Sequence, residues 1–354
     1  MREHRGGAAR QNQFVKHSFP FCSCPHLSLS LDKIGGGSAK SIRETFVSLL
    51  LLPSPFTIFA PRIAIHGYSK LREHPFFILL AHIMTDYKLI VLDLDGTLTN
   101  SKKEITPATR NALLQVQELG IKVVLASGRP TYGIMPLADE LQMQRYGGYI
   151  LSYNGGQIID CSTGKRVFET VLPDEIVPQL YAASQEFGTT LLSYDGRYIL
   201  TEEPENIYVR KEAFLNKMEI KGVTNFLEAL PLPVTKCLMV GDGEHLAKVT
   251  EIMQQRFGDR ISVYRSEPFF LELVAQHINK ARSLERLLSL LDLTPAQMIA
   301  CGDGYNDLSM IRFAGLGVAM ANAQQEVKEN ADYITSSNDD EGVTKVIERF
   351  ILNG

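Results

Sequence analysis

The chain has 354 residues, of which 45% are hydrophobic and 21% charged, as is typical of a globular protein of about two domains. Its formal net charge of −4 gives no indication of a nucleic-acid partner. The 5 cysteines are scattered and form no C-x-x-C pair, so neither a disulfide framework nor a zinc site is indicated, and a reducing, cytoplasmic location fits best.

Residues 1–83 differ in composition from the rest of the chain. They hold 10 Lys+Arg and 4 Asp+Glu, whereas residues 84–354 hold 26 and 36. The apolar run 46–65 has the length of a membrane span, but its three prolines and Arg62 argue against a transmembrane helix. We expect residues 1–83 to be disordered or absent from the native domain. An organelle transit segment and an upstream translation artefact before Met84 both stay open.

Regular structure is expected from Met84 onward. A buried strand is predicted over 88–92, because the run is short, apolar and rich in β-branched residues. A helix should follow, with Thr106 as N-cap, Pro107 in the first turn and Gly120 as the stop. A second buried strand over 121–126 completes a β-α-β unit, which predicts a parallel sheet.

The middle of the chain has a different pattern. Strands are expected at 149–152 and 157–160, and between about 168 and 273 helical stripes alternate with short strands. The helices are predicted over 176–187 and 244–257, and the strands over 190–193, 197–201, 236–240 and 262–264. This pattern indicates an α+β insertion, which we assign to residues 166–274.

The first pattern resumes with a helix that begins at Lys280. Strands are predicted over 298–301, 316–320 and 333–334, and helices over 308–313 and 343–352. The predicted fold class is therefore α/β, with a three-layer, Rossmann-like parallel-sheet core formed by residues 84–165 and 275–354 and an inserted α+β cap domain.

Polar side chains follow three of the predicted core strands. Asp93 and Asp95 follow the first, Ser127 and Gly128 the second, and Asp303, Asn306 and Asp307 come after the strand at 298–301. Ligands of open α/β sheets gather at the carboxyl ends of strands, so these groups should converge. Clustered carboxylates repel one another unless a cation lies among them, and oxygen ligands suit Mg²⁺.

This constellation suits phosphoryl transfer. A lysine, a hydroxyl and a backbone N–H beside a metal can hold a phosphoryl group, and Lys280, Ser127 and Gly128 offer them. Asp93 could then attack phosphorus and form an aspartyl-phosphate. Asp95 could protonate the leaving alcohol and later deprotonate the hydrolytic water.

The motifs Asp93-Leu94-Asp95-Gly96-Thr97, Ala126-Ser127-Gly128-Arg129-Pro130, Lys280 and Gly302-Asp303-Gly304-Tyr305-Asn306-Asp307 resemble those of the haloacid dehalogenase superfamily. Their order and spacing are similar to its Cof-type sugar-phosphatase branch, which carries a C2-type cap between the second and third motifs. The resemblance covers about residues 84–354.

The resemblance implies a role for each matching position. Asp93, Asp95 and Lys280 would be catalytic. Asp93, Asp303 and the backbone carbonyl of Asp95 would bind Mg²⁺, with Asp307 supporting the metal from a second layer. The substrate phosphate would be bound by Leu94, Ser127, Gly128, Lys280 and Asn306.

Several residues have structural interpretations. Asp307 could simply cap the helix at 308–313, and Asp242 is best explained as the entry to a helix. Arg129 could contact substrate or be structural. The turn at Asn154 should be structural, and Ala281 stands where this branch usually has glycine. His245, His277 and Cys301 are expected to have no catalytic part.

The sequence therefore predicts a Mg²⁺-dependent phosphatase that hydrolyses small phosphomonoesters, sugar phosphates above all. Its expected partner is a small phosphorylated metabolite, with no nucleic acid or membrane, and it would be a monomer or homodimer. Two alternatives stay open: a phosphomutase of phosphorylated sugars, and a non-catalytic protein of the same fold that binds a phosphate ligand.

Overall fold

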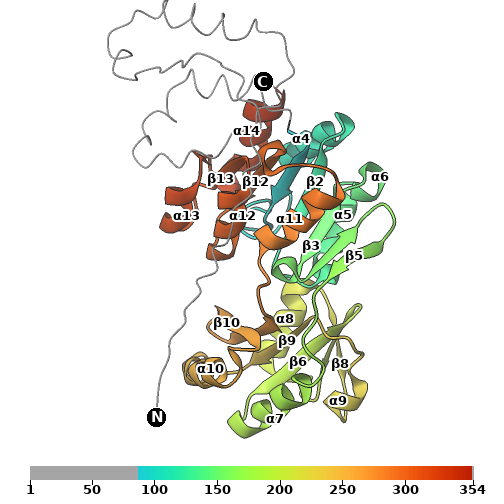
Figure 1. Cartoon of the computed structure of the whole chain (residues 1–354), viewed down its shortest axis with the longest axis vertical. Helices are drawn as coiled ribbons and strands as arrows, with labels where there is room; N and C mark the ends of the chain where they lie inside the picture. The colour runs from blue at the N-terminus through green and yellow to red at the C-terminus, as the bar shows by residue number, and fades with distance from the viewer. Residues whose placement is uncertain (1–86, 353–354) are drawn as a thin grey trace, which may run out of the picture. The chain divides into compact units, whose positions relative to one another are not determined.

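The computed structural model describes residues 87–352, which lie within one unit of tertiary contacts (Figure 1). The expectations for residues 1–83 fall outside the described residues. Within the described part the chain forms two sheets, one of eight strands and one of six. Each sheet is enclosed by its own helices, so they are described in turn.

The eight-stranded sheet has the order β14-β13-β12-β1-β2-β3-β4-β5. The strands from β14 to β3 are parallel, and β4 and β5 are antiparallel. Their bounds are β1 Leu89–Leu92, β2 Lys122–Ala126, β3 Tyr149–Ser152, β4 Gln157–Asp160, β5 Lys165–Glu169, β12 Met298–Gly302, β13 Leu316–Ala319 and β14 Tyr333–Ile334. The predicted parallel sheet is confirmed.

Helices cover both faces of this sheet (Figure 1). Helices α4 and α14 pack together, as do α11, α12 and α13. Right-handed crossovers place these two groups on opposite faces, because the chain crosses the sheet in opposite directions before and after the insertion. The helices are α4 Pro107–Glu118, α5 Thr131–Glu140, α6 Met143–Tyr146, α11 Lys280–Leu290, α12 Leu308–Phe313, α13 Gln325–Asn330 and α14 Gly342–Ile347, which continues as a π-helix over Glu348–Leu352.

Local sequence explains where α4 begins and how it packs. The Thr106 hydroxyl accepts a hydrogen bond from the Thr109 N–H, and Pro107 occupies the first turn, where a missing N–H costs nothing. The face that carries Leu113 and Val116 is fully buried against the sheet. The predicted N-cap is therefore confirmed, together with the helix that it starts.

The six-stranded sheet has the order β10-β11-β9-β6-β7-β8 and is antiparallel except for the β7-β8 pair. Its strands are β6 Thr190–Asp195, β7 Tyr198–Thr201, β8 Glu219–Gly222, β9 Lys236–Val240, β10 Ile261–Glu267 and β11 Phe270–Ala275. Its helices are α7 Val177–Phe187, α8 Ile207–Asn216, α9 Phe226–Ala229 and α10 Gly243–Phe257.

The two faces of this second sheet have separate apolar clusters. Helices α7, α9 and α10 pack on one face, while α8 packs on the other through Val209 and Ala213. Helices α8 and α9 and strands β8 and β11 are not among the elements predicted from the sequence. The eight-stranded sheet includes β5, so it extends past the boundary that we placed at residue 165. The division into core and cap domains stays a prediction.

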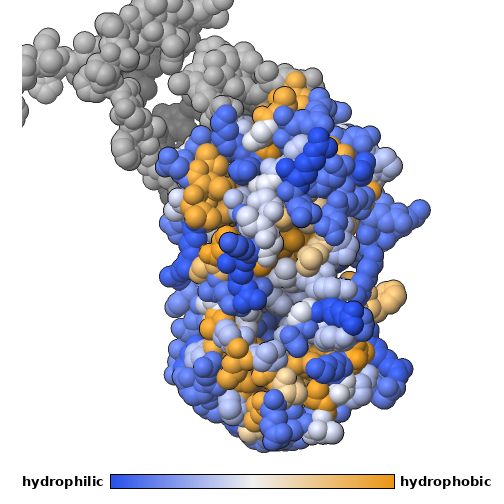
Figure 2. All heavy atoms as spheres, turned by 90° about the vertical axis from the view of Figure 1, so that its right-hand side faces the viewer, coloured by the Kyte–Doolittle hydropathy of each residue, from blue (hydrophilic) through white to orange (hydrophobic). Residues whose placement is uncertain are grey.

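On the face drawn in Figure 2, hydrophilic residues predominate and hydrophobic ones form separate patches. Exposed large apolar side chains include Leu119, which caps the C-terminal end of α4, and the neighbours Phe214 and Leu215 on α8. Among the helices within residues 87–352, none has the length and apolarity that crossing a bilayer requires.

Candidate active site

Three adjacent strands of the eight-stranded sheet end at one place. The order β12-β1-β2 brings together Asp303, Asp93 and Ser127, each of which directly follows its strand. Segments far apart in the chain thus come into contact. The Thr97 hydroxyl donates to Asp303 Oδ1 at 2.9 Å, across 206 residues. The predicted convergence at the carboxyl edge of the sheet is observed.

The turn after β1 is tight and needs glycine at its centre. The Leu98 N–H donates to the Asp93 carbonyl at 3.1 Å, and the Thr99 N–H donates to the Leu94 carbonyl at 2.9 Å. Gly96 has φ of +87°, and a Cβ there would lie 2.4 Å from Asp303 Oδ2. Any side chain at this position would strain the backbone and displace the Asp303 carboxylate.

Lys280 lies at the centre of the site. Its side chain is fully buried at the first turn of α11, and its Nζ donates to Asp93 Oδ1 at 2.5 Å and to Asp307 Oδ1 at 2.6 Å. A third hydrogen bond goes to the Ala126 carbonyl at 2.7 Å, which satisfies all three N–H donors. Lys280 therefore connects the ends of three separate segments.

Asp307 has a different role from that of a helix cap. Its Oδ2 accepts from the N–H groups of Asp303 and Gly304, at 3.0 and 2.9 Å, while its Oδ1 accepts from Lys280. No side-chain capping bond to α12 is formed. Because both oxygens are engaged in this way, Asp307 holds the loop of Asp303 in place.

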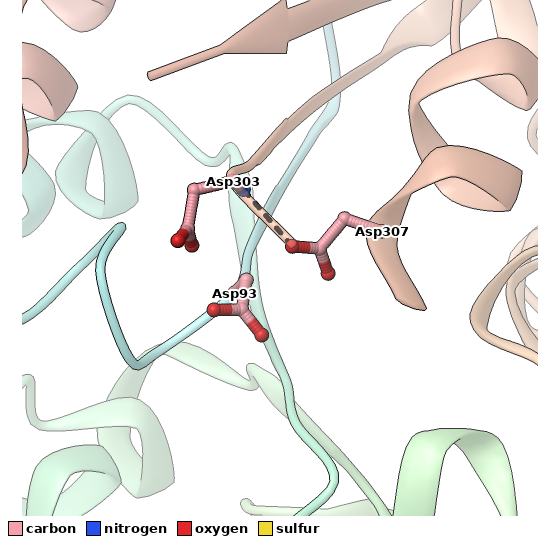
Figure 3. A group of neighbouring side chains, drawn as sticks. All are labelled: Asp93, Asp303 and Asp307. Carbon is pink, nitrogen blue, oxygen red and sulfur yellow. Dashed lines mark hydrogen bonds between the residues drawn. The ribbon is translucent and has the colours of Figure 1, made fainter. Parts of the chain in front are cut away.

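The residues present fit a divalent cation. Asp93, Asp303 and Asp307 each offer a carboxylate oxygen, and these oxygens lie within 4.8 Å of one another. Figure 3 shows the three carboxylates around a common space, with the Asp303 N–H donating to Asp307. Three carboxylates face a single ammonium group, so a doubly charged cation would balance the excess.

The electrostatics of the cation-free site agree with this fit. Burial, with the charge of Asp307, raises the pKa of Asp93 from 3.8 to about 8. Burial also raises the pKa of Asp303 from 3.8 to about 6, and Asp307 adds to that rise. Burial lowers the pKa of Lys280, but the charges of Asp307 and Asp93 outweigh burial and raise this pKa above its ordinary value. Lys280 is therefore charged at every pH of interest.

Asp95 faces a different environment. Its carboxylate is 38% exposed and accepts two hydrogen bonds from Arg129, Nε to Oδ2 at 2.8 Å and Nη2 to Oδ1 at 2.6 Å, and one from Lys103 Nζ at 2.8 Å. Burial raises the pKa of Asp95, but the two cations outweigh it and the pKa lies below 3.8. The Asp95 side chain does not belong to the cluster of Asp93, Asp303 and Asp307. The metal contact predicted for Asp95 would therefore use its backbone carbonyl.

The predicted phosphate-binding residues adjoin in sequence the groups that bond to Lys280: Leu94 follows Asp93, Ser127 and Gly128 follow Ala126, and Asn306 precedes Asp307. The Ser127 hydroxyl accepts from the Arg129 N–H at 3.2 Å, and a Cβ on Gly128 would lie 3.0 Å from the side-chain nitrogen of Asn154. Asn306 is exposed at the rim. The Leu94 side chain is fully buried, so only its main chain could reach a ligand.

The structure adds residues that the sequence analysis did not place here. The Asn154 side-chain amide donates to the Tyr264 hydroxyl and accepts from Asn306 Nδ2, both at 3.1 Å. It thereby links the core loop to β10 of the second sheet. We had expected this turn to be only structural, and no signal in the sequence pairs Asn154 with Tyr264 or Arg129 with Asp95.

Other candidates lie outside the site. Asp242 caps α10, with Oδ1 accepting from the N–H groups of Glu244 and His245, which confirms its interpretation as a helix entry. The His245 ring bonds to the Phe187 carbonyl, and Cys301 is buried within β12. Asn279, beside the departure at Ala281, caps α11 by accepting from the Arg282 N–H. The alanine therefore leaves the position of Lys280 intact.

Replacing Lys280 by methionine should destabilise the protein. The buried carboxylates of Asp93 and Asp307 would lose the ammonium group that pairs with both, and breaking such a buried pair costs about 3 kcal/mol or more. Urea unfolding at pH 8 with a chelator present measures the loss. Lys248→Met, at an exposed position on α10, is the matched control and should change stability by at most about 0.5 kcal/mol. Equal effects of the two substitutions would contradict the central place of Lys280.

The raised pKa values also predict how stability changes with pH. The folded protein keeps protons on Asp93 and Asp303 that the unfolded chain releases near pH 4, so the cation-free protein should lose stability as pH rises from about 4 to 8.

Mg²⁺ must displace these protons, so it should raise Tm more at pH 8 than at pH 6. Thermal unfolding with Mg²⁺ or a chelator measures this, and equal shifts at both pH values would refute it. Asp303→Asn should reduce the difference.

Comparison with known proteins shows the family of this chain. Residues 90–347 match the family model described as haloacid dehalogenase-like hydrolase. A 5-amino-6-(5-phospho-D-ribitylamino)uracil phosphatase of Bacillus subtilis is 30% identical over 75% of this chain and 97% of its own length. A haloacid dehalogenase-like hydrolase from Bacteroides thetaiotaomicron is 57% identical, with a TM-score of 0.73 over 74% of this chain and 99% of its own. A subclass IIB sugar phosphatase is 25% identical, with a TM-score of 0.63 over 74% and 98%. The chain therefore belongs to the haloacid dehalogenase-like hydrolase family.

Proposed function

We propose that this protein is a Mg²⁺-dependent phosphatase that hydrolyses small phosphomonoesters, in particular sugar phosphates, through an aspartyl-phosphate intermediate. The observation that carries the proposal is the clustering of the carboxylates of Asp93, Asp303 and Asp307. The fully buried Lys280 pairs with Asp93 and Asp307 in this cluster. The relatives named above are phosphatases or hydrolases. Their substrates are properties of those proteins, and they support phosphate esters as the class to test here.

In the proposed reaction Asp93 attacks phosphorus. A carboxylate oxygen of Asp93 bonds to phosphorus while the bond from phosphorus to the alcohol oxygen breaks. Lys280 holds the other Asp93 oxygen and fixes the direction of attack, and its charge stabilises the phosphoryl oxygens. We assign Ser127, Gly128, Asn306 and the Leu94 main chain to the phosphate. Mg²⁺, held by Asp93, Asp303 and the Asp95 carbonyl, would supply further positive charge to the phosphoryl oxygens.

We assign both proton transfers to Asp95. It would give a proton to the departing alkoxide and then take one from the water that attacks the aspartyl-phosphate. The ion pairs with Arg129 and Lys103 keep Asp95 ionised in the ligand-free site. A phosphate dianion nearby would raise the pKa of Asp95 and compete for those cations, so substrate binding itself would favour the protonated acid.

We further propose the domain division and location predicted from the sequence. The six-stranded sheet with its helices would act as a cap that selects the leaving group and limits water at the site. The expected partner is a small phosphorylated metabolite in the cytoplasm, acted on by a monomer or homodimer.

A screen for phosphate release tests the proposal. The native protein would be incubated with p-nitrophenyl phosphate and a panel of metabolite phosphates, with Mg²⁺ or with a chelator. We expect Mg²⁺-dependent release of inorganic phosphate. An isomeric ester in place of free phosphate would indicate a phosphomutase, and no turnover of any ester would favour a phosphate-binding protein.

A further inference from the structure

One face of the six-stranded sheet carries a group of buried polar side chains. Cross-strand pairs share a face, and the register pairs Tyr264 with Glu272, Glu272 with Leu238, and Leu238 with Leu192. Alternate residues on the same strands, Lys236 and Tyr194, therefore lie on that face too. Lys236 Nζ is 2.6 Å from Glu272 Oε2, with both side chains buried.

Helix α8 lies on the same face and adds a further carboxylate, Glu212 (Figure 1). Only 6% of Glu212 is exposed. The Tyr194 hydroxyl donates to its Oε1 at 2.7 Å, and among residues 87–352 no other hydrogen bond reaches this carboxylate. Its Oε2 therefore has no donor among these residues, although the side chain is almost fully buried. It is not one of the solvent-inaccessible atoms that lack a partner, so it is open to a donor from water or a ligand.

Glu212 lies close to the catalytic end of the core. Lys236 Nζ lies 5.4 Å from the ring centroid of Tyr194, whose hydroxyl bonds to Glu212. Burial raises the pKa of Glu212, and the charges of Lys236 and Arg129 oppose that rise. Arg129 is bonded to Asp95. The first turn of α5, which follows Arg129, packs on α8: a Cβ on Gly133 would lie 2.7 Å from Asn216 Oδ1. On the same sheet face, the Tyr264 hydroxyl accepts a hydrogen bond from Asn154. The Asn154 side chain also contacts Asn306 and lies beside Gly128, two of the residues assigned to the phosphate.

We propose that Glu212 determines specificity by accepting a hydrogen bond from a hydroxyl group of the leaving alcohol. The inference rests on the proposed function and narrows its substrate class to esters of polyhydroxylated alcohols. Glu212 supplies an acceptor, while Lys236 and the Tyr264 hydroxyl on the same sheet face supply donors, the mixed set that a polyol requires. A plain alkyl chain would exclude water from the Glu212 carboxylate and give no donor in return, so such esters would be rejected.

The test compares esters with chemically similar leaving oxygens. Glucose 6-phosphate, sorbitol 6-phosphate and ribose 5-phosphate release hydroxylated primary alcohols, and n-hexyl phosphate releases a primary alcohol with no other hydroxyl. Both classes of ester need a proton at the leaving oxygen. A substitution that disturbed Asp95 would therefore change kcat/KM for both classes by the same factor. Phosphate release with Mg²⁺ gives kcat/KM for each ester. We expect the best hydroxylated ester to exceed n-hexyl phosphate by about 100-fold or more.

Glu212→Gln keeps the size of the side chain and removes its charge. It should lower kcat/KM for the best hydroxylated ester about tenfold or more and change that for n-hexyl phosphate less than about threefold. Glu212→Met, which has no comparable acceptor, should lower kcat/KM for the best hydroxylated ester further. Glu251→Gln, at an exposed position on α10, is the matched control and should change neither. Thermal unfolding of each variant verifies the fold.

Two results would overturn the inference while leaving the phosphatase proposal in place. One is wild-type turnover of p-nitrophenyl phosphate with no preference for the hydroxylated esters over n-hexyl phosphate. The other is an equal effect of Glu212→Gln on both classes of ester. Failure to release phosphate from any ester, p-nitrophenyl phosphate included, would remove the phosphatase proposal, and the inference with it.

Discussion

Asp93→Asn should reduce phosphate release by roughly 10⁵-fold or more, the scale of loss when a covalent nucleophile is removed. The amide keeps the size of the side chain but cannot form an aspartyl-phosphate. Intact-mass measurement after rapid acid quenching should find one added phosphoryl group on the wild-type protein and none on the variant. Steady-state phosphate release gives the size of the loss.

The stability of this variant is an internal control. The pKa of Asp93 is raised to about 8 because its charge is buried near Asp307 and Asp303, so removing that charge should not destabilise the cation-free protein at pH 8. Lys280 keeps Asp307 and the Ala126 carbonyl as partners. A stable Asp93→Asn variant that retained a tenth of wild-type turnover would exclude Asp93 as the nucleophile.

Asp95→Asn should slow hydrolysis of alkyl phosphates 10²–10⁴-fold, about the usual contribution of general acid–base catalysis. The amide can hold neither the proton for the departing alkoxide nor the one from the attacking water. It also loses the ion pairs with Arg129 and Lys103. These pairs lie at a partly exposed carboxylate, so their loss should change stability only slightly.

An aryl ester separates the two proton transfers. An aryloxide leaves without protonation, so Asp95→Asn should still form the aspartyl-phosphate from p-nitrophenyl phosphate and then stall for want of a base. Rapid mixing should show a burst of p-nitrophenol of about one equivalent per enzyme, as expected when an intermediate accumulates. If the variant keeps more than about a tenth of the wild-type rate on alkyl esters, the proton-transfer role of Asp95 is wrong.

The sequence by itself determined the fold class and the residues that meet at the core site. Apolar runs such as 88–92 identify buried parallel strands without knowledge of their neighbours, because both faces of each strand are covered. The carboxyl ends of parallel strands lie along one edge of a sheet, so Asp93, Ser127 and Asp303 could be expected to converge there. Helix caps such as Thr106 are equally local, since donor and acceptor lie three residues apart.

Only the tertiary structure decided the partners of these residues. The pairing of Arg129 with Asp95, the bond from Asn154 to Tyr264 and the position of Glu212 join segments that have no pattern in common. Strand and helix periods indicate which face of an element is buried, but they do not indicate which element covers that face. The partners of a polar side chain depend on that covering element, and so the surroundings of Asp95 and of Glu212 follow from packing and not from local sequence.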